Sequence, residues 1–337
     1  MTTKNKGRTL GELGEREFLR RFIPILNRHN RRSFVVPPGD DGAVLKNPAG
    51  TVLSIDALTE GTHFKLSWER RCRDWGGFSL PRGLGWKLLG SSLSDLAAMG
   101  GSRDRWAMIY LGAPGGLSYE FLKELYRGVR EAAHRYHCAL AGGDTVKAKD
   151  LTLVAAVGAS LTTRPLTRGG ARPGDLVCVA GTVGDAAMGL RVMQGKSGLR
   201  KPLASYFLRR FFGHEPLLEE GKILGSEKGV TALMDLSDPL DDCLNLMMEA
   251  SQVGMEINVD SIPVSRPYRR SFPVGAELLG GGEDYSLLFT VRPERAPPLR
   301  RRLSFAVIGR VSRRKQGLSY RLNGRTSAPD SVFRHFG

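Results

Sequence analysis

A stretch rich in glycine and proline near the middle of the chain limits the folds open to it. Residues 161–174 contain five of these residues, namely Pro165, Gly169, Gly170, Pro173 and Gly174. Glycine and proline interrupt helix and strand patterns alike, so such a stretch is typical of a domain boundary. Strand and helix patterns continue on both sides of it. We therefore predict an α/β (α+β) chain of two domains, residues 1–164 and residues 165–337.

Hydrophobic periodicity predicts the elements of each half. In the first half, strands are predicted at 51–56, 105–111, 138–141 and 151–158, and helices at 85–99 and 118–136. In the second half, strands are predicted at 176–180, 232–235, 255–259, 285–291 and 305–311, and one helix at 239–253. Ser118 is expected to cap its helix, and Gly254 is expected to end the helix at 239–253.

Composition places the chain among ordinary globular proteins. Its 337 residues include 50 Lys and Arg against 34 Asp and Glu, a formal net charge of +16, and 41% are hydrophobic. The longest apolar stretch, 151–161, is shorter than the roughly 20 residues that a membrane helix needs. No apolar segment follows the basic N-terminal residues, and the four cysteines form no C-x-x-C pair. We therefore expect a cytoplasmic protein with no membrane partner.

Acidic residues recur beside glycines or at predicted strand ends. They lie in six short segments: 39–42, 54–56, 93–95, 142–145, 235–238 and 282–284. One interpretation is that each carboxylate caps a turn or a helix, since aspartate accepts hydrogen bonds from nearby backbone N–H groups. The other is a polynuclear site for Mg²⁺, which takes a few carboxylates and binds substrate phosphates. Six such segments in one basic chain favour the metal site.

The familiar nucleotide-binding loops are missing from the sequence. The segment 189–197 has one residue too many between its glycines for a Walker loop, and we expect it to form a loop of another kind. The glycines at 83 and 85 lack the third glycine of a dinucleotide-binding turn. Any nucleotide must therefore be bound through other residues.

Seven segments together resemble the thiamine-monophosphate kinases. They are GDDGAVL (39–45), SIDALTEGTHF (54–64), LGSSLSDLAAMGG (89–101), LAGGDT (140–145), PGDLVCVAGTVGDAAMGL (173–190), LMDLSDPL (233–240) and GGEDYSLLFTV (281–291). That family is similar to aminoimidazole ribonucleotide synthetase, selenophosphate synthetase and the hydrogenase maturation protein HypE. The resemblance implies two domains with mixed sheets flanked by helices. It also implies a homodimer that uses ATP and several Mg²⁺ ions to phosphorylate thiamine monophosphate to thiamine diphosphate.

The same resemblance implies roles for individual residues. The implied metal ligands are Asp41, Ser54, Ile55 through its backbone, Asp56, Asp95, Asp144, Asp235 and Asp238. The implied ATP contacts are Tyr126, Gly143, Asp144, Arg168 and Ser237. The implied contacts to thiamine monophosphate are His63, Glu283 and Phe333. No residue is implied as a general base, because the attacking phosphate oxygen is ionised near neutral pH and the reaction chiefly requires charge neutralisation.

Some of these residues also have structural interpretations, and some positions depart from the family pattern. The alternative for His63 is a polar residue satisfied beside a strand end, and for Glu283 a cap of the next strand, but for both we favour substrate contact. For Phe333 a core position is an equal alternative. Three departures are Ile55 in place of a hydroxyl residue, Ser92 in place of asparagine, and Pro239 in place of glycine. The basic segment 65–82 is longer than the family pattern.

Two other functions remain open at this point. One is a different ATP-using reaction of the same superfamily. The other, suggested by the basic charge, is nucleic-acid binding, which predicts retention on DNA with a steep salt dependence. We rank it below the kinase.

Overall fold

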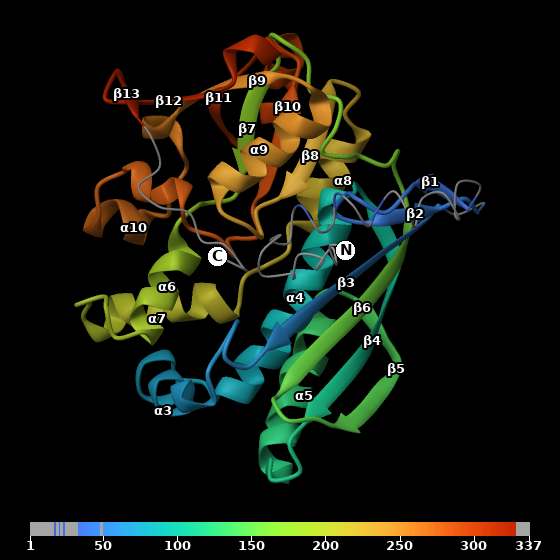
Figure 1. Ribbon diagram of the computed structural model, residues 1–337, viewed down its shortest axis with the longest axis vertical. Helices are drawn as coiled ribbons and strands as arrows, with labels where there is room; N and C mark the ends of the chain where they lie inside the picture. The colour runs from blue at the N-terminus through green and yellow to red at the C-terminus, as the bar shows by residue number, and fades with distance from the viewer. Residues whose placement is uncertain (1–16, 18–19, 21–22, 24–32, 48–49, 328–337) are drawn as a thin grey trace, which may run out of the picture.

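The computed structural model describes residues 17, 20, 23, 33–47 and 50–327. Figure 1 shows two sheets with helix α4 (Leu80–Ala98) between them. The first sheet has the strand order β1-β2-β3-β6-β4-β5. Its strands are β1 (Phe34–Val36), β2 (Ala43–Leu45), β3 (Thr51–Thr59), β4 (Ser102–Ala113), β5 (Cys138–Lys147) and β6 (Thr152–Leu161). All neighbouring pairs are antiparallel except β4 and β5, which are parallel.

The second sheet begins after the irregular residues 162–175. Its strand order is β13-β12-β9-β11-β7-β10-β8, with β12 and β9 as the parallel pair. The strands are β7 (Leu176–Ala180), β8 (Val230–Asp235), β9 (Gly254–Asn258), β10 (Leu287–Val291), β11 (Ala306–Ser312), β12 (Leu318–Leu322) and β13 (Arg325–Ser327). Both sheets are therefore mixed, as the resemblance implied. The domain boundary near residue 165 stays a prediction, which the irregular segment supports.

Helix α4 is enclosed by both halves of the chain. Most of its residues are apolar or small, and sixteen of its nineteen positions are buried, which is the pattern of a core helix. It crosses α5 (Tyr119–Arg135) closely, since a Cβ on Gly128 would lie 2.0 Å from the carbonyl oxygen of Arg82. It crosses α8 (Leu218–Ser226) as closely, at Gly221. Small residues thus let three helices pack at short range.

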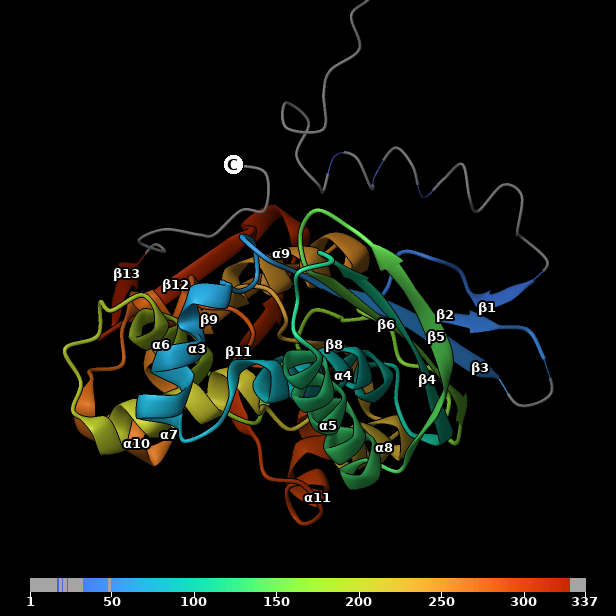
Figure 2. The same ribbon diagram turned by 90° about the horizontal axis from the view of Figure 1, so that it is seen from below.

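The second half of the chain contains several further helices. They are α6 (Asp185–Met193), α7 (Lys201–Phe212), α9 (Leu240–Ser251), α10 (Arg266–Ser271) and α11 (Ala296–Arg300). The basic segment of the first half, which includes α3 (Glu69–Arg71) and the turn Cys72–Gly76, packs against α7. Figures 1 and 2 both place α3 beside α7. The ring of Phe78 meets that of Phe212 edge to face, with centroids 5.4 Å apart. This segment therefore bridges the two halves.

One face of the six-stranded sheet carries α4 and α5, and the other is not covered by any part of the chain that the structure describes. Along β6 the buried residues Leu153, Ala155 and Val157 alternate with partly exposed ones. Ile55 and Met108 flank Ala156 in register, and their side chains are 66% and 47% exposed. We call this surface the open face of the sheet. It is apolar and exposed over at least two strands.

Most elements predicted from periodicity are present, although their bounds differ by a few residues, as in α4, which begins at Leu80, and β5, which extends to Lys147. Helix α9 ends at Ser251 because Gln252 adopts a left-handed conformation with φ 57°. Gly254, the expected end of that helix, instead begins β9. The segment 189–197 is also only partly a loop, since residues up to Met193 belong to α6. Ser118 caps α5 as predicted, accepting a hydrogen bond from the N–H of Phe121 at 3.2 Å. Within the described residues, no helix is long and apolar enough to cross a membrane.

Candidate functional site

Four aspartates from different elements lie close together at the junction of the two sheets. Asp41 precedes β2, Asp56 lies on β3, Asp95 lies near the end of α4, and Asp235 ends β8. The N–H of Asp235 donates to Asp41 Oδ2 at 3.2 Å, so the two halves meet at these residues. Ser54 donates a short hydrogen bond to Asp95, which links β3 to α4. We call these four residues the acidic cluster.

Burial and mutual repulsion disfavour the charged form of the cluster. Burial raises the pKa of Asp41 to about 8, with a further increase from Asp235 and Asp40 that Arg168 opposes. Burial and the charge of Asp235 raise the pKa of Asp56 to about 6. The pKa of Asp95 lies well above its ordinary value, again chiefly through burial and then through its acidic neighbours. Clustered buried carboxylates of this kind require positive charge nearby if they are to be ionised together.

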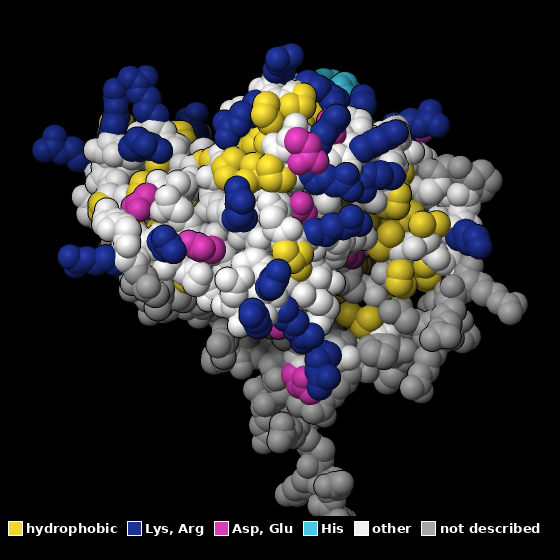
Figure 3. All heavy atoms as spheres, turned by 90° about the horizontal axis from the view of Figure 1, so that it is seen from above, with side chains coloured by type: hydrophobic (Ala, Val, Ile, Leu, Met, Phe, Trp, Pro, Cys, Tyr) yellow, Lys and Arg dark blue, Asp and Glu magenta, His cyan; other side chains and the backbone are white. Residues whose placement is uncertain are grey.

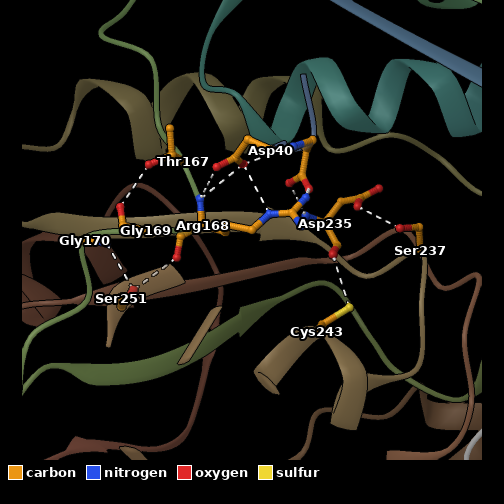
Figure 4. A network of polar contacts seen from close by, with 10 residues as sticks. Asp40, Thr167, Arg168, Gly169, Gly170, Asp235, Ser237, Cys243 and Ser251 are labelled. Atoms are coloured by element: carbon orange, nitrogen blue, oxygen red, sulfur yellow. Dashed lines mark hydrogen bonds and ion pairs between the residues drawn. The ribbon is translucent and has the colours of Figure 1, made fainter. Parts of the chain in front are cut away.

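Arg168 supplies part of that positive charge (Figure 4). Its guanidinium forms a short ion pair with Asp41, and its Nε lies 3.5 Å from Asp40 Oδ1. The backbone N–H of Arg168 also donates to both carboxylate oxygens of Asp40, at 3.1 and 3.2 Å. The hydroxyl of Ser251 donates to the Arg168 carbonyl and accepts from the N–H of Gly170. The polar network thus fixes Arg168 against the segment 40–41.

The donor set of the cluster fits a divalent cation that keeps water and phosphate ligands. The buried Asp235 Oδ2 accepts no hydrogen bond from the described part of the chain, while Ser237 donates to its Oδ1 at 3.1 Å. Among the residues that the structure describes, no three His, Cys, Asp or Glu side chains converge tightly enough to hold an ion by themselves. Each ion would therefore take one or two carboxylates from the protein and the rest of its ligands from water or phosphate. Mg²⁺ is bound in this way, since it retains several waters.

A cavity of about 1530 Å³ adjoins the cluster. It reaches from Asp56 and Asp238 to the basic segment, whose Arg71 donates to the carbonyl of Val192 at 3.2 Å. Five of the residues predicted for the site line it: Asp56, His63, Ser237, Asp238 and Glu283. The cavity thus joins a carboxylate-rich end to a wall of Arg and Trp side chains.

His63 and Glu283 occupy different parts of the cavity wall. His63 lies after β3, where its Nδ1 accepts a hydrogen bond from the N–H of Thr59 at 3.0 Å. It therefore stabilises a local turn and faces the cavity at once. Glu283 has a left-handed backbone with φ 63°, and its N–H donates to the carbonyl of Ser237 at 2.8 Å. Its carboxylate pairs with Lys87. The local turn at His63 and the ion pair of Glu283 both leave these side chains at the cavity wall, where they can also contact a substrate.

Several predicted residues lie away from the cluster. Asp144 pairs with Tyr110 in register, on the open face of the edge strand β5. Gly143 lies beside it, so close to β4 that a Cβ would be 1.8 Å from the carbonyl oxygen of Ile109. Tyr126 lies on the exposed side of α5, and the Ile55 side chain points to the open face. Phe333 lies outside the described residues.

Three residues beyond the predicted set take part in this region. Asp40 shares Arg168 with Asp41, and its place in the G-D-D-G turn was an available signal. The hydroxyl of Ser92, a departure from the family pattern, donates to the carbonyl of Leu88 at 3.0 Å and opposes the rise in the pKa of Asp56. Lys87 is the third. It is the one charged residue between Arg82 and Asp95 in a helix that is otherwise apolar or small, which marks it in the sequence.

Comparisons with known proteins agree with this geometry. Residues 39–160 match the family model for the N-terminal domain of AIR synthase related proteins, and residues 172–320 match the model for the C-terminal domain. The fold and the acidic cluster therefore define an AIR synthase-related protein. HypE of Escherichia coli, 20% identical with a TM-score of 0.64 over 92% of this chain and 98% of its own, shares the fold.

More similar relatives indicate one family within the AIR synthase-related proteins. The thiamine-monophosphate kinase of Synechococcus elongatus is 31% identical over 344 residues, which cover 98% of each chain. That of Bacillus subtilis is 32% identical over 263 residues, 76% of this chain and 77% of its own. A solved structure described as AaThiL complexed with AMPPCP and TMP is 28% identical with a TM-score of 0.81, covering 98% of this chain and all of its own (100%). The chain belongs to the thiamine-monophosphate kinase family.

Proposed function

We propose that the protein transfers the γ-phosphoryl group of ATP to thiamine monophosphate, which yields ADP and thiamine diphosphate. The observation that carries this proposal is the position of the acidic cluster beside the cavity, at the junction of both halves of the chain. The relatives are named for this activity, and the solved neighbour is described with an ATP analogue and TMP. A cavity of about 1530 Å³ is large enough for two substrates of this size.

Mg²⁺ is the metal that the cluster fits, and it would neutralise the negative charges of the two substrates. Asp41, Asp56, Asp95 and Asp235 would hold the ions, with Asp238 at the outer end of the cavity. Ser54 and Ser237 support this role, since each hydroxyl donates to a carboxylate of the cluster. The hydroxyls fix the orientation of those carboxylates before any ion binds.

The chain's own residues supply positioning and charge. Arg168 lies against Asp40 and Asp41, where a guanidinium is within reach of phosphate oxygens that approach the cluster. Ser237 and Asp238 line the cavity next to the cluster. Glu283 and His63 face the acceptor from the other walls, and a carboxylate there complements the cationic thiazolium ring. With both substrates held in line, transfer needs no phosphorylated enzyme.

A homodimer is the second part of the proposal. The open face presents Ile55 and Met108 as adjacent apolar side chains, and exposed apolar sheet surfaces of this kind mark sites of association. A second copy of the chain would cover this face. Asp144 belongs to that face and Gly143 precedes it on β5, and their roles in metal and ATP binding stay predictions, as does that of the Ile55 backbone. Tyr126 and Phe333 stay predictions as substrate contacts.

A cytoplasmic location is the remaining prediction. All four cysteines, Cys72, Cys138, Cys178 and Cys243, are free and buried. Unpaired cysteines are typical of proteins that remain in a reducing compartment. Fractionation of the native cells, with immunodetection of the chain, tests this.

The test of the activity is a coupled assay of ADP formation with three acceptor conditions: thiamine monophosphate, thiamine and none. We expect ADP only with thiamine monophosphate and Mg²⁺, and no ADP in EDTA. Turnover with thiamine but not with its monophosphate would overturn the assignment, and would indicate another ATP-using reaction of the same class. Retention of configuration at a chiral γ-phosphorus would overturn direct in-line transfer.

The basic surface is the feature that suggests nucleic-acid binding as the alternative function, and this alternative can be tested separately. Figure 3 shows Lys and Arg side chains gathered over the face seen from above, with few acidic ones among them. Excess positive charge of this kind raises the local concentration of anionic substrates. Nucleic-acid binding instead predicts retention on DNA that falls steeply with salt. Strong retention at 0.15 M salt without kinase activity would favour that function.

A further inference from the structure

Lys87 is buried in the centre of the protein, although lysine is rarely found there. It lies on α4, eight residues before Asp95, or about 12 Å along the helix axis. Its side chain is only 1% exposed. Burial lowers its pKa, so a charged ammonium group at this position requires stabilising neighbours.

Two kinds of neighbour offset that cost. The Lys87 ammonium lies 2.8 Å from Glu283 Oε1, and it also lies over the ring of Phe211, 3.5 Å from the centroid. A cation over an aromatic ring and beside a carboxylate is held in one place by both contacts. The ring of Phe212 lies further away, at 5.9 Å. Lys87 therefore has a fixed geometry with Glu283 as its acidic partner.

A neutral ring pair closes the other side of this site. His214 is buried and stacks on Tyr285, with centroids 3.8 Å apart and planes 21° apart. Burial, and then the charge of Lys87, keep the pKa of His214 well below its ordinary value. The groups around the ammonium are thus one carboxylate, one neutral imidazole and aromatic rings. Nothing else with a negative charge is described as pairing with it.

Glu283 is less buried than Lys87, because its side chain remains 27% exposed and lines the cavity. An ion pair that served packing alone would be replaced at little cost by two apolar residues. Here one partner is anchored in the core and the other faces the substrate space. The backbone of Glu283 is also held in a left-handed conformation between Gly282 and Asp284. The contacts together fix where this carboxylate lies.

We propose that Lys87 is a positioning residue that holds the Glu283 carboxylate at the cavity wall, and thereby sets the affinity for a cationic acceptor. This inference rests on the proposed function and deepens it. Lys87 and the cluster aspartate Asp95 belong to one rigid helix. Helix α4 therefore fixes the distance between Lys87, which holds the Glu283 carboxylate, and Asp95 in the acidic cluster.

The test is a double-mutant cycle with Lys87→Met, Glu283→Gln and both changes together. We expect Lys87→Met to raise KM for thiamine monophosphate by about tenfold or more, with a smaller change in kcat and none in KM for ATP. The double variant should show the same KM as Glu283→Gln alone, because Lys87 acts through Glu283. Lys123→Met is the matched control, since Lys123 forms an exposed ion pair with Glu120 on α5. Its KM values should equal those of the unchanged protein.

Thermal unfolding provides a second readout that needs no turnover. Glu283→Gln leaves a buried ammonium unpaired and should lower Tm, whereas adding Lys87→Met should restore most of the loss. Additive effects on both KM and Tm would overturn the positioning role. An unchanged KM in Lys87→Met would do the same, provided that the unchanged protein is active. Absence of turnover in the unchanged protein would instead overturn the proposed function.

Discussion

Asp56 and Asp144 lie on opposite faces of the six-stranded sheet, three strands apart. Asp56 pairs with the buried Ala155 on the side of α4, whereas Asp144 pairs with Tyr110 on the open face. Three strand spacings amount to about 14 Å, so one chain does not bring both carboxylates to one ion. Within one chain, these two carboxylates therefore serve different places, Asp56 the acidic cluster and Asp144 the open face.

Met108→Asp tests the homodimer proposed at the open face. A carboxylate at the centre of the open face would be buried without a partner in the dimer, so we expect dissociation into single chains and a loss of ADP formation. Sedimentation equilibrium measures the mass, and the coupled assay measures the activity. Tyr119→Asp is the control, because Tyr119 is also an exposed apolar residue but lies at the start of α5. A monomeric unchanged protein with full activity would contradict this prediction.

Local pattern was enough to predict most of the elements, since each strand or helix carries its own periodicity. The strand β7 was predicted with the bounds that it has, and Ser118 was identified as a cap. The end of α9 was not, because glutamine rarely adopts a positive φ and the sequence around Gln252 contains no other sign of it.

The site was predicted less completely, because burial and pairing between distant elements are not local properties. The segments of the acidic cluster were visible, yet nothing in their spacing separates Asp56 from Asp144. Lys87 was missed for a related reason. Its place as the one charged residue in an apolar or small stretch was an available signal, but lysine is usually found at the surface, and the packing of Phe211 and Glu283 around it places it in the core.

The crossing of α4 and α5 depends on glycine, and Gly128→Ala tests it. A Cβ at this position would lie 2.0 Å from the carbonyl oxygen of Arg82, so the two helices would have to separate. We expect a loss of about 2 kcal/mol or more in the free energy of unfolding, measured in urea, despite the better helix propensity of alanine. Gly115→Ala is the control, since a Cβ there meets no atom within 4 Å. Equal stability of the two variants would contradict the close crossing.

The raised pKa of Asp41 predicts how the free energy of unfolding depends on pH when divalent ions are removed. Its folded-state pKa of about 8 lies above the value near 3.9 in the unfolded chain, so folding takes up a proton between these values. Its contribution to stability is complete below about pH 4 and is lost as pH rises through about 8. In EDTA, the unfolding free energy should fall over this range. Asp41→Asn should reduce the slope by up to about 1.4 kcal/mol per pH unit.

Urea unfolding at pH 5, 6, 7 and 8 in EDTA measures that slope for both proteins. Added Mg²⁺ should stabilise the unchanged protein at pH 8 more than Asp41→Asn, because an ion that binds the folded state shifts the equilibrium toward it. Parallel pH profiles for the two proteins would contradict the assignment of this proton to Asp41.

Removing the charge of Asp95 should lower the catalytic activity without lowering the stability of the fold. It accepts a hydrogen bond from Ser54, and the charges of Asp56, Asp235 and Asp41 raise its pKa after the dominant effect of burial. Asp95→Asn keeps an oxygen that can accept from Ser54 but removes one of the carboxylates that a cation requires. We expect kcat/KM to fall by about a hundredfold or more, with partial recovery at high Mg²⁺.

The Tm of Asp95→Asn in EDTA should stay the same or rise, because a like-charge repulsion is removed. Asp104→Asn, at an exposed position paired only with Arg103 among the described ion pairs, is the control and should leave both quantities unchanged. A fall in Tm as large as the loss of activity would show that Asp95 supports the fold instead of the metal.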